Sequence, residues 1–383
     1  MSTLKVNTIN AATSGQGVAV DVQNPRSFRN LFINGAMQVA QRGTSSAVSG
    51  TTNGFGSVDR YYVGYNGVNE APTQEQADIS AGTTPYTLGF RKSLKITNGN
   101  QTGGADAGDY IFINMPQEAQ YLAQSGWNYK SSSSYVTLSF WIKSSVAQNF
   151  YFQFDVRDGT RQNYTMETGS LTANTWTKIT KVIPGNSNLT IDNDNGVGAY
   201  LTFGVFWGTD LTASMSLETW AAANDSIKTP DNTSTWYTTN DSTLEFTGIQ
   251  LEAGSYATDF EHRSYGEELS RCQRYYQRWA GDHGGSYGIS AGYTYASGTA
   301  TATGLNLSTP LRASPTVKNI TNGGVLYSQG NTSTILNIGF SGYTLKSNWV
   351  ALGLNQNSSL GSSNHASTLA NVNNQYIALE AEL

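Results

Sequence analysis

The sequence is poor in charged residues, and its positive charge is scattered. Only 13% of the 383 residues are charged, which is about half of the usual quarter for soluble proteins. Lys and Arg number 22 against 27 Asp and Glu, and no basic run is longer than Arg91-Lys92. Because nucleic acid binding needs a basic patch that neutralises phosphates, we expect no nucleic acid partner.

Cysteine and long apolar runs are scarce too. The single cysteine, Cys272, excludes an intramolecular disulfide and a cysteine metal cluster, and we expect a buried thiol. No apolar run approaches the roughly 20 residues that cross a bilayer, and the polar start of the chain has no signal peptide pattern. We therefore expect a protein that is synthesised in a host cytoplasm and does not insert into a membrane.

In place of charge the chain is rich in Gly, Ser, Thr and Asn, and 11% of its residues are aromatic. This composition disfavours long helices and suits turns and exposed strands. Hydrophobic residues make up 38% and are spread along the chain, which argues against disorder. We predict a mainly β protein with an N-terminal arm (1–30), a two-sheet β-sandwich (31–262), a linking helix (263–281) and a small C-terminal β domain (282–383).

Alternation of apolar and polar residues between turn residues predicts the strands. The best pair covers residues 136–142 and 150–156, which we interpret as neighbouring strands with a shared apolar inner face. Further strands are expected at 94–97, 110–114, 176–183, 200–207 and 244–251, with a short helix near 217–223. In the C-terminal region strands are expected at 287–295, 299–307, 335–340, 349–354 and 375–383.

Residues 246–279 combine a strand with a capped amphipathic helix. The apolar parity of the strand changes at Gly248, which predicts a β-bulge. Ser264 and Glu267 form a capping box, so a helix should begin near Tyr265 and end at Gly281. One apolar stripe of this helix, expected at an oligomer interface, consists of Leu269, Cys272, Tyr276 and Trp279.

Several segments resemble a family of bacteriophage tail fibre proteins. They are LFINGAMQVAQRGTS at 31–45, VDRY at 58–61, TLSFWIKSS at 137–145, GIQLEAGSYATDFEHRSYGEELSRCQRYYQR at 248–278 and the ending AEL at 381–383. Tyr61 stands where such proteins usually have Trp, which we expect to change packing alone. The start, MSTLKVNTI, is similar to the virion-attachment start of fibres from phages of cyanobacteria.

The resemblance implies an architecture and a role. The sandwich would be a jelly roll similar to carbohydrate-binding modules, the assembly a homotrimer, and the location the tail of a virion. The N-terminal arm would dock on other virion tail proteins, and the distal part would bind a surface polysaccharide of a bacterial host, which the similarity of the start implies to be a cyanobacterium. The alternatives are a head decoration or tail-assembly component that makes only protein contacts, and a capsule-degrading enzyme.

Outward-facing aromatic residues are the candidates for glycan binding, because a flat ring stacks on a sugar while polar neighbours bind its hydroxyls. If 136–142 and 150–156 are neighbours, then Trp141, Tyr151, Gln153 and Asp155 share one outer face. The C-terminal candidates are Tyr293, Tyr295 and Trp349. The alternative for both groups is packing against a neighbouring loop or a sister subunit.

Signals for catalysis and metal binding are weak. Ser286 lies in a G-x-S-x-G pattern, but a helix precedes it and a strand follows, the reverse of a nucleophile elbow. No carboxylate pair stands out, and His262, His283 and His365 have no second ligand at metal spacing, so we expect no enzyme. No cofactor is expected, except that Asp192 and Asp194 could hold a structural calcium if the DNDNG segment is more than a turn.

Overall fold

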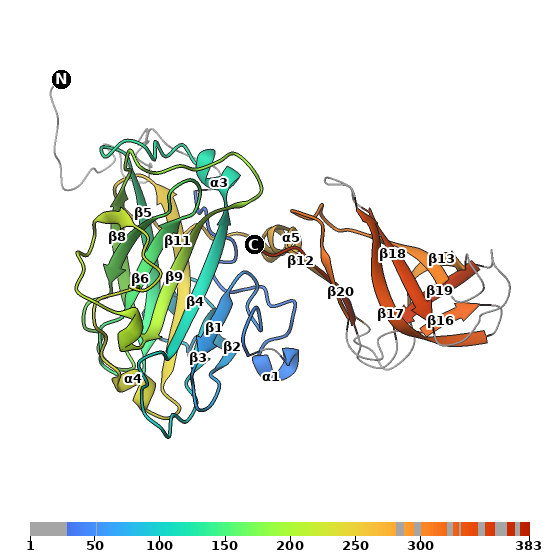
Figure 1. Ribbon diagram of the computed structural model, residues 1–383, viewed down its shortest axis with the longest axis horizontal. Coiled ribbons are helices and arrows are strands. Elements are labelled where there is room, and N and C mark those ends of the chain that lie inside the picture. Colours follow the sequence, from blue (N-terminus) through green and yellow to red (C-terminus); the bar gives the residue numbers. More distant parts are fainter. Residues whose placement is uncertain are drawn as a thin grey trace, which may run out of the picture.

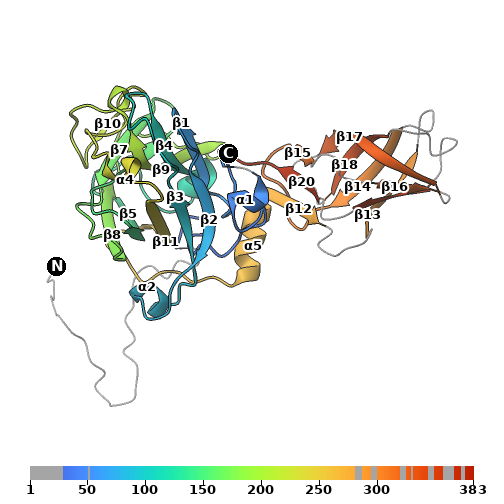
Figure 2. The ribbon, with the colours of Figure 1, turned by 90° about the horizontal axis from the view of Figure 1, so that it is seen from below.

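The computed structural model describes residues 29–50, 52–280, 287–294, 300–319, 325–328, 331–343, 349–356, 366–371 and 376–383. A β-sandwich body and a closed barrel lie at opposite ends of the molecule, with a helix and a small sheet between them (Figures 1 and 2). The expected fold class, a mainly β protein with a jelly-roll body, a linking helix and a small C-terminal β domain, is confirmed. Apart from Arg29 and Asn30, the N-terminal arm lies outside the described residues.

The body consists of two antiparallel sheets between which the chain crosses repeatedly, as in a jelly roll. The six-stranded sheet has the order β1 (Tyr62–Asn66), β4 (Tyr110–Glu118), β9 (Val197–Trp207), β6 (Tyr151–Val156), β7 (Gln162–Glu167) and β10 (Trp220–Ala222). The five-stranded sheet has the order β2 (Thr73–Asp78), β3 (Lys92–Thr97), β11 (Thr243–Ala253), β5 (Tyr135–Ser144) and β8 (Thr177–Pro184).

The helices in the body are short. They are α1 (Ser46–Ser49), α2 (Thr84–Thr87), α3 (Ala119–Ala123), α4 (Thr235–Thr238) and the 3-10 turn η1 (Thr209–Leu211). The helix expected near 217–223 is wrong, because β10 occupies this stretch and pairs with β7 at the edge of the sheet. The edge of β7 offers backbone hydrogen bonds to β10, and the residues of β10 alone do not reveal this partner.

The core fills the space between the two sheets, and it corrects the predicted strand pairing. β5 pairs with β11 and β8 in one sheet, whereas β6 pairs with β7 and β9 in the other. Their apolar faces do meet, but across the sandwich: the rings of Phe140 and Phe152 are 5.3 Å apart, nearly perpendicular. The other five strands expected in the body all exist.

The predicted bulge in β11 is confirmed. Gly248 has a φ of 65°, and the register with β5 shifts between Thr247 and Gln250. Beyond the bulge, Ile249 N donates to Gly35 O at 3.0 Å. A Cβ on Gly35 would lie 2.2 Å from Ile249 O, so the bulge and this loop approach each other as only glycine permits.

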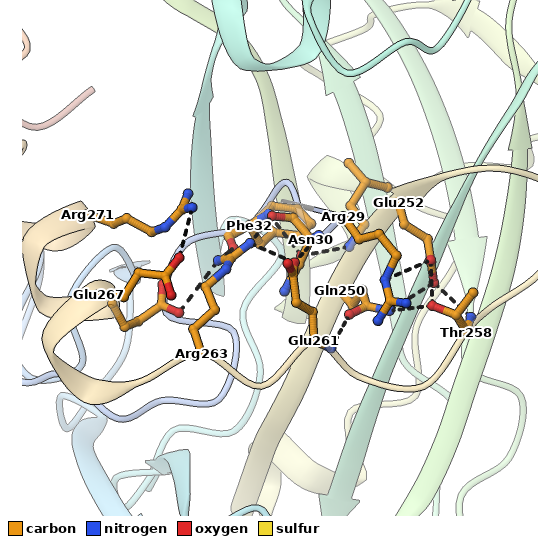
Figure 3. A network of polar contacts seen from close by, with 12 residues as sticks. Arg29, Asn30, Phe32, Gln250, Glu252, Thr258, Glu261, Arg263, Glu267 and Arg271 are labelled. Atoms are coloured by element: carbon orange, nitrogen blue, oxygen red, sulfur yellow. Dashed lines mark hydrogen bonds and ion pairs between the residues drawn. The ribbon is translucent and has the colours of Figure 1, made fainter. Parts of the chain in front are cut away.

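A polar network fastens the start of the described chain to the end of β11 (Figure 3). Asn30 Nδ2 donates to Ile249 O at 2.9 Å, and its Oδ1 accepts from Leu251 N at 3.1 Å. Arg263, immediately before the linking helix, donates to Phe32 O at 3.1 Å (Figure 3). Asn30 and Phe32 are thus held against β11 and the segment before α5.

The linking helix begins as predicted and ends early. α5 (Tyr265–Gln273) is capped by Ser264 Oγ, which accepts from Glu267 N at 3.3 Å. The expected continuation to Gly281 is wrong, because the chain enters β12 (Tyr276–Ala280), which pairs with β20 (Tyr376–Glu380). Hydrogen bonds to a strand 100 residues away thus replace those of further helical turns.

The predicted apolar stripe is divided between three environments within one chain. Leu269 and the buried Cys272 pack on Ile33 and Val39 of the body. Tyr276 on β12 is 2% exposed, and Trp279 packs on the apolar cluster of the small sheet. Cys272 and Tyr276 are therefore covered already, which leaves no surface of theirs for the expected oligomer interface.

The C-terminal region contains a three-stranded sheet and a barrel. The sheet has the order β12, β20 and β15 (Thr316–Asn319). The barrel is β13 (Tyr287–Thr294), β14 (Ala300–Asn306), β18 (Trp349–Gln356), β17 (Asn331–Tyr343), β16 (Val325–Ser328) and β19 (Ala366–Asn371). The five strands expected here exist, while β15, β16 and β19 carried no clear signal.

The end of the chain returns to the body. Glu382 pairs with Arg60 and, at 3.1 Å, with Arg42, which also pairs with Glu380 at 2.9 Å. Both arginines are buried, and their guanidinium groups lie over the rings of Tyr276 and Tyr275. We call this group of ion pairs the C-terminal clasp.

Replacing Gly248 should destabilise the body. In Gly248→Ala the methyl group would be 2.7 Å from the Phe90 ring at a φ that disfavours L residues, so we expect a loss of about 2–4 kcal/mol. The control Gly82→Ala has φ +84° but open space, and it should cost only about 1 kcal/mol. Urea unfolding monitored by tryptophan fluorescence measures both, and equal losses would contradict the role of the contact.

The C-terminal clasp should respond to the loss of one carboxylate. Glu382→Gln leaves Arg60 without the only carboxylate that pairs with it in the described residues, so we expect a loss of about 3–5 kcal/mol. Glu218→Gln, which breaks a partly exposed pair with Lys181, should cost less than about 1 kcal/mol. Calorimetric melting of the full chain gives both values. A Glu382→Gln melting curve like that of the parent protein would refute this role of the clasp.

Candidate functional site

The outer face of the six-stranded sheet carries a group of aromatic side chains. β1 contributes Tyr62, β4 contributes Tyr110 and Phe112, and β9 contributes Trp207. Alternate residues of these strands, such as Ile111 and Ile113, point into the core, which directs the aromatic ones outward. We call these four residues the aromatic face.

The four rings form one nearly continuous surface. The Tyr62 and Phe112 rings are 6.1 Å apart with planes 20° apart, and those of Phe112 and Trp207 are 5.6 Å apart at 11°. Tyr110 lies 5.8 Å from Phe112. Because Tyr62, Tyr110 and Phe112 are only partly buried, this surface is open to a ligand.

Two glycines make room for the rings. In the strand register Phe112 lies between Gly64 of β1 and Gly204 of β9. A Cβ on Gly64 would be 2.3 Å from the Phe112 ring, and one on Gly204 would be 2.1 Å from Trp207 Nε1. The rings therefore occupy the space that side chains at these two positions would take.

Polar groups lie next to the aromatic face. Asn114 is opposite Tyr62 in the register and opposite Thr202 of β9, whose hydroxyl donates to Asn114 Oδ1. Among the described residues no acceptor binds Asn114 Nδ2, so its two N–H groups can bind ligand hydroxyls. Partly exposed aromatic rings with a few hydrogen-bonding groups beside them are a combination that suits a sugar ring.

The predicted glycan-binding residues do not all share this face. Tyr151, Gln153 and Asp155 lie on β6 of the six-stranded sheet, and Tyr151 is opposite Gly204 in the register. Trp141 lies on β5, on the outside of the other sheet. The expectation of one shared face is wrong because the two strands belong to different sheets.

Gln153 and Asp155 are occupied by internal contacts. Gln153 Nε2 donates to Thr165 Oγ1 at 3.0 Å and to the carbonyl of Lys228. Asp155 accepts from Arg157 at 2.8 Å and from Arg161 at 2.9 Å. The side chains of Gln153 and Asp155 are buried. Tyr151 remains partly exposed, with a pKa that burial, and then the charge of Glu167, raises above its usual value.

Trp141 lines a hollow of about 260 Å³ on the outer side of the five-stranded sheet. The hollow is bounded by Lys178 and Ser139 on the strands and by Phe260 and His262 on the segment before α5. His262 is held by a hydrogen bond of 2.9 Å between Nε2 and Leu88 O. An aromatic and polar lining makes this hollow a second place for a small ligand.

The remaining candidates lie in the C-terminal region. Tyr293 is on β13 and Trp349 begins β18, on strands of the barrel that are not neighbours in its order. Tyr295, Ser286, His283 and His365 lie outside the described residues. The structure therefore does not bring the C-terminal candidates together with those of the body.

The DNDNG segment forms a tight turn. Asp194 Oδ1 accepts from Gly196 N at 2.8 Å, and Asp192 N donates to Asp158 Oδ2 at 2.8 Å. In the described part of the chain no three His, Cys, Asp or Glu side chains come together in a way that could hold a metal ion. A calcium site at Asp192 and Asp194 stays a prediction.

No protein-family model matches the sequence, and no curated protein matches it. Among solved structures, the enzymatically active domain of tailspike protein 4 of bacteriophage CBA120 has 11% identity and a TM-score of 0.33. The match covers 59% of this chain but only 22% of the tailspike chain. None of the helices in the described residues is long and apolar enough to cross a membrane.

Two further similar structures have names that refer to carbohydrate. A putative sugar binding protein from Bacteroides thetaiotaomicron matches with 10% identity, 59% of this chain, all of its own (100%) and a TM-score of 0.32. The N-terminal cellulose-binding domain of Cellulomonas fimi β-1,4-glucanase C matches with 10% identity, 57% of this chain, 99% of its own and a TM-score of 0.27. Identities and scores this low do not indicate a function.

Sequence reasoning missed the aromatic face, although part of its signal is present. The predicted strand at 110–114 alternates Ile111 and Ile113 with Tyr110 and Phe112, so two outward rings were visible. Their contact with Tyr62 and Trp207 depends on the strand order, which alternation does not give.

Filling one glycine position should disrupt the aromatic face. Gly204→Ala would place a methyl group against Trp207, so we expect a changed near-ultraviolet circular dichroism spectrum and a loss of about 1–3 kcal/mol. Gly266→Ala, where a Cβ has nothing within 4 Å, is the control and should leave the spectrum unchanged. An unaltered spectrum for Gly204→Ala would mean that the rings do not depend on this glycine.

Proposed function

We propose that this chain is a noncatalytic subunit of a bacteriophage tail fibre that attaches the particle to its host by binding a surface polysaccharide. The aromatic face is the observation that carries the proposal. Its partly exposed rings offer an apolar surface to sugar rings, and Asn114 offers N–H donors to their hydroxyls. The phage context comes from the sequence segments that resemble tail fibres.

The chemistry of the aromatic face supports binding without cleavage. Glycoside hydrolysis needs two carboxyl groups on opposite sides of the sugar. On this face the carboxylate that faces outward from β6 is Asp155, which is buried and paired with Arg157 and Arg161. Its carboxylate is therefore already engaged by two arginines within the chain.

Assembly would multiply weak binding. In a homotrimer docked on the virion through its N-terminal arm, three aromatic faces per fibre would bind one polymer, so avidity would exceed the affinity of a single site. A head decoration or tail-assembly component would use the same β surfaces for protein contacts alone. A capsule-degrading enzyme would release reducing ends from the polymer.

Removing rings from the aromatic face should weaken polysaccharide binding. For Tyr62→Ala and Tyr110→Ala we expect about tenfold weaker binding each, equivalent to about 1.4 kcal/mol, because each deletes part of the stacking surface. Affinity electrophoresis in gels that contain host polysaccharide measures the change. Tyr256→Ala removes a tyrosine that is 61% exposed in a turn beyond β11, and it serves as the control.

The same assay separates the alternatives. Retained binding in Tyr62→Ala and Tyr110→Ala would contradict the assignment to this face. If binding were lost only in Trp141→Ala, the hollow on the five-stranded sheet would be the site. No binding by the parent chain, together with normal incorporation into particles, would favour a purely structural component, and release of reducing sugar would favour an enzyme.

A further inference from the structure

A groove of about 520 Å³ lies where the body meets the linking segment. On the body side it is lined by Gln120, Tyr121 and Gln124 around α3, and on the other side by Arg274 and Arg312. The volume lies within the range of about 300–1,000 Å³ that is usual for sites of small ligands. We call it the junction groove, and it shares no residue with the aromatic face.

Arg312 forms no ion pair in the described residues, and its hydrogen bonds go to the main chain. Its Nη1 donates to Asn195 O at 2.6 Å, its Nε to Ala381 O at 2.9 Å and its Nη2 to Glu382 O at 2.9 Å. All three acceptors are backbone carbonyls, and no carboxylate in the described residues pairs with it. Since a guanidinium has five N–H groups, two remain for a ligand.

The pair next to it is neutral. Arg274 donates to both oxygens of Glu118, at 2.7 and 2.9 Å, and Tyr275 adds a third hydrogen bond. Burial opposes the ionisation of Glu118, but these hydrogen bonds outweigh it and hold the pKa of Glu118 below its usual value. Both oxygens of Glu118 are thereby taken by Arg274, and Arg312 has no carboxylate bonded to it in the described residues.

Other groups of the lining fit a sugar. Tyr121 offers a half-buried ring. Gln120 and Gln124 offer their amide oxygens, while their amide nitrogens donate to Glu118 and Asn193. The one acidic side chain of the lining is Asp194, which already accepts from Gly196 N. An acceptor-rich anion with hydroxyl groups would find its partners here in an otherwise acidic chain of net charge −5.

We propose that the junction groove binds a carboxylate-bearing sugar residue, whose carboxylate pairs with Arg312 while its ring lies beside Tyr121. The groove then selects a charged sugar. The aromatic face consists of uncharged residues and does not distinguish a charged sugar from a neutral one. This inference rests on the proposed function in one respect: the bound polysaccharide supplies the sugar residue that enters the junction groove. The ligand would also contact the body and the linking segment together, and so would hold the barrel in place relative to the sandwich.

The test compares two probes on the full chain by isothermal titration calorimetry. The probes are a trimer of galacturonic acid and the matching neutral trimer of galactose. We expect the acidic trimer to bind about tenfold more tightly at low salt, with the difference shrinking as ionic strength rises. Equal affinity for the two trimers would overturn the proposal.

Variants at the rim locate the binding without disturbing Arg312. Gln124→Glu places a carboxylate at the exposed edge of the groove and should weaken the acidic trimer about fivefold. Asp194→Asn keeps the acceptor for Gly196 N and removes a negative charge that repels the acidic trimer, so it should strengthen the binding of that trimer. The control Thr87→Glu adds the same charge on α2 of the body, away from the groove, and should leave the affinity for the acidic trimer unchanged.

The outcomes separate this proposal from the one for the aromatic face. Tyr62→Ala should weaken the binding of host polysaccharide and leave the affinity for the acidic trimer unchanged. If Gln124→Glu leaves the acidic trimer unchanged, or if Tyr62→Ala abolishes its binding, the junction groove is not the site. In the first of these cases the proposed function of the aromatic face still stands.

Discussion

The C-terminal clasp is the interaction on which the arrangement of the two lobes depends. Arg42 and Arg60 belong to the first half of the body and are buried, and a buried guanidinium costs several kcal/mol unless a carboxylate pairs with it. Arg42 has one such carboxylate nearby in Asp59, at 3.8 Å, but its closer partners Glu380 and Glu382, and the partner Glu382 of Arg60, lie more than 300 residues later at the end of the chain. The last strand must therefore run back to the body, and the C-terminus lies between the two lobes (Figure 1).

This return creates the surroundings of the linking segment. β20 supplies the edge that β12 joins, and thereby ends α5 after nine residues. Arg312 caps the carbonyls of Ala381 and Glu382 and reaches the body at Asn195. The junction groove remains because these contacts tie the linking segment to the body at some points without filling the space between them. The aromatic face also depends on space that the chain leaves unfilled: Gly64 and Gly204 have no side chains, and the neighbouring rings extend into that space.

Local signals predicted the parts of the fold that depend on near neighbours. The bulge at Gly248 and the cap at Ser264 are confirmed because parity and capping act over a few residues. The pairing of 136–142 with 150–156 is wrong, since alternation identifies the inner face of a strand but not its sheet. The same error placed Trp141 beside Tyr151, whereas the two lie on different sheets, so the sequence could propose sugar-binding residues but not their arrangement.

The amino-acid sequence by itself determined a mainly β chain with little charge, the positions of most strands, and a capped helix between two β regions. These follow from residue chemistry, because propensity, parity and capping are local properties. Only the tertiary structure decided which strands are neighbours, where the helix ends and which aromatic rings lie together. Those outcomes depend on hydrogen bonds and burial between residues far apart in the chain, such as Arg42 and Glu382, which are 340 positions apart and share no local window of the sequence.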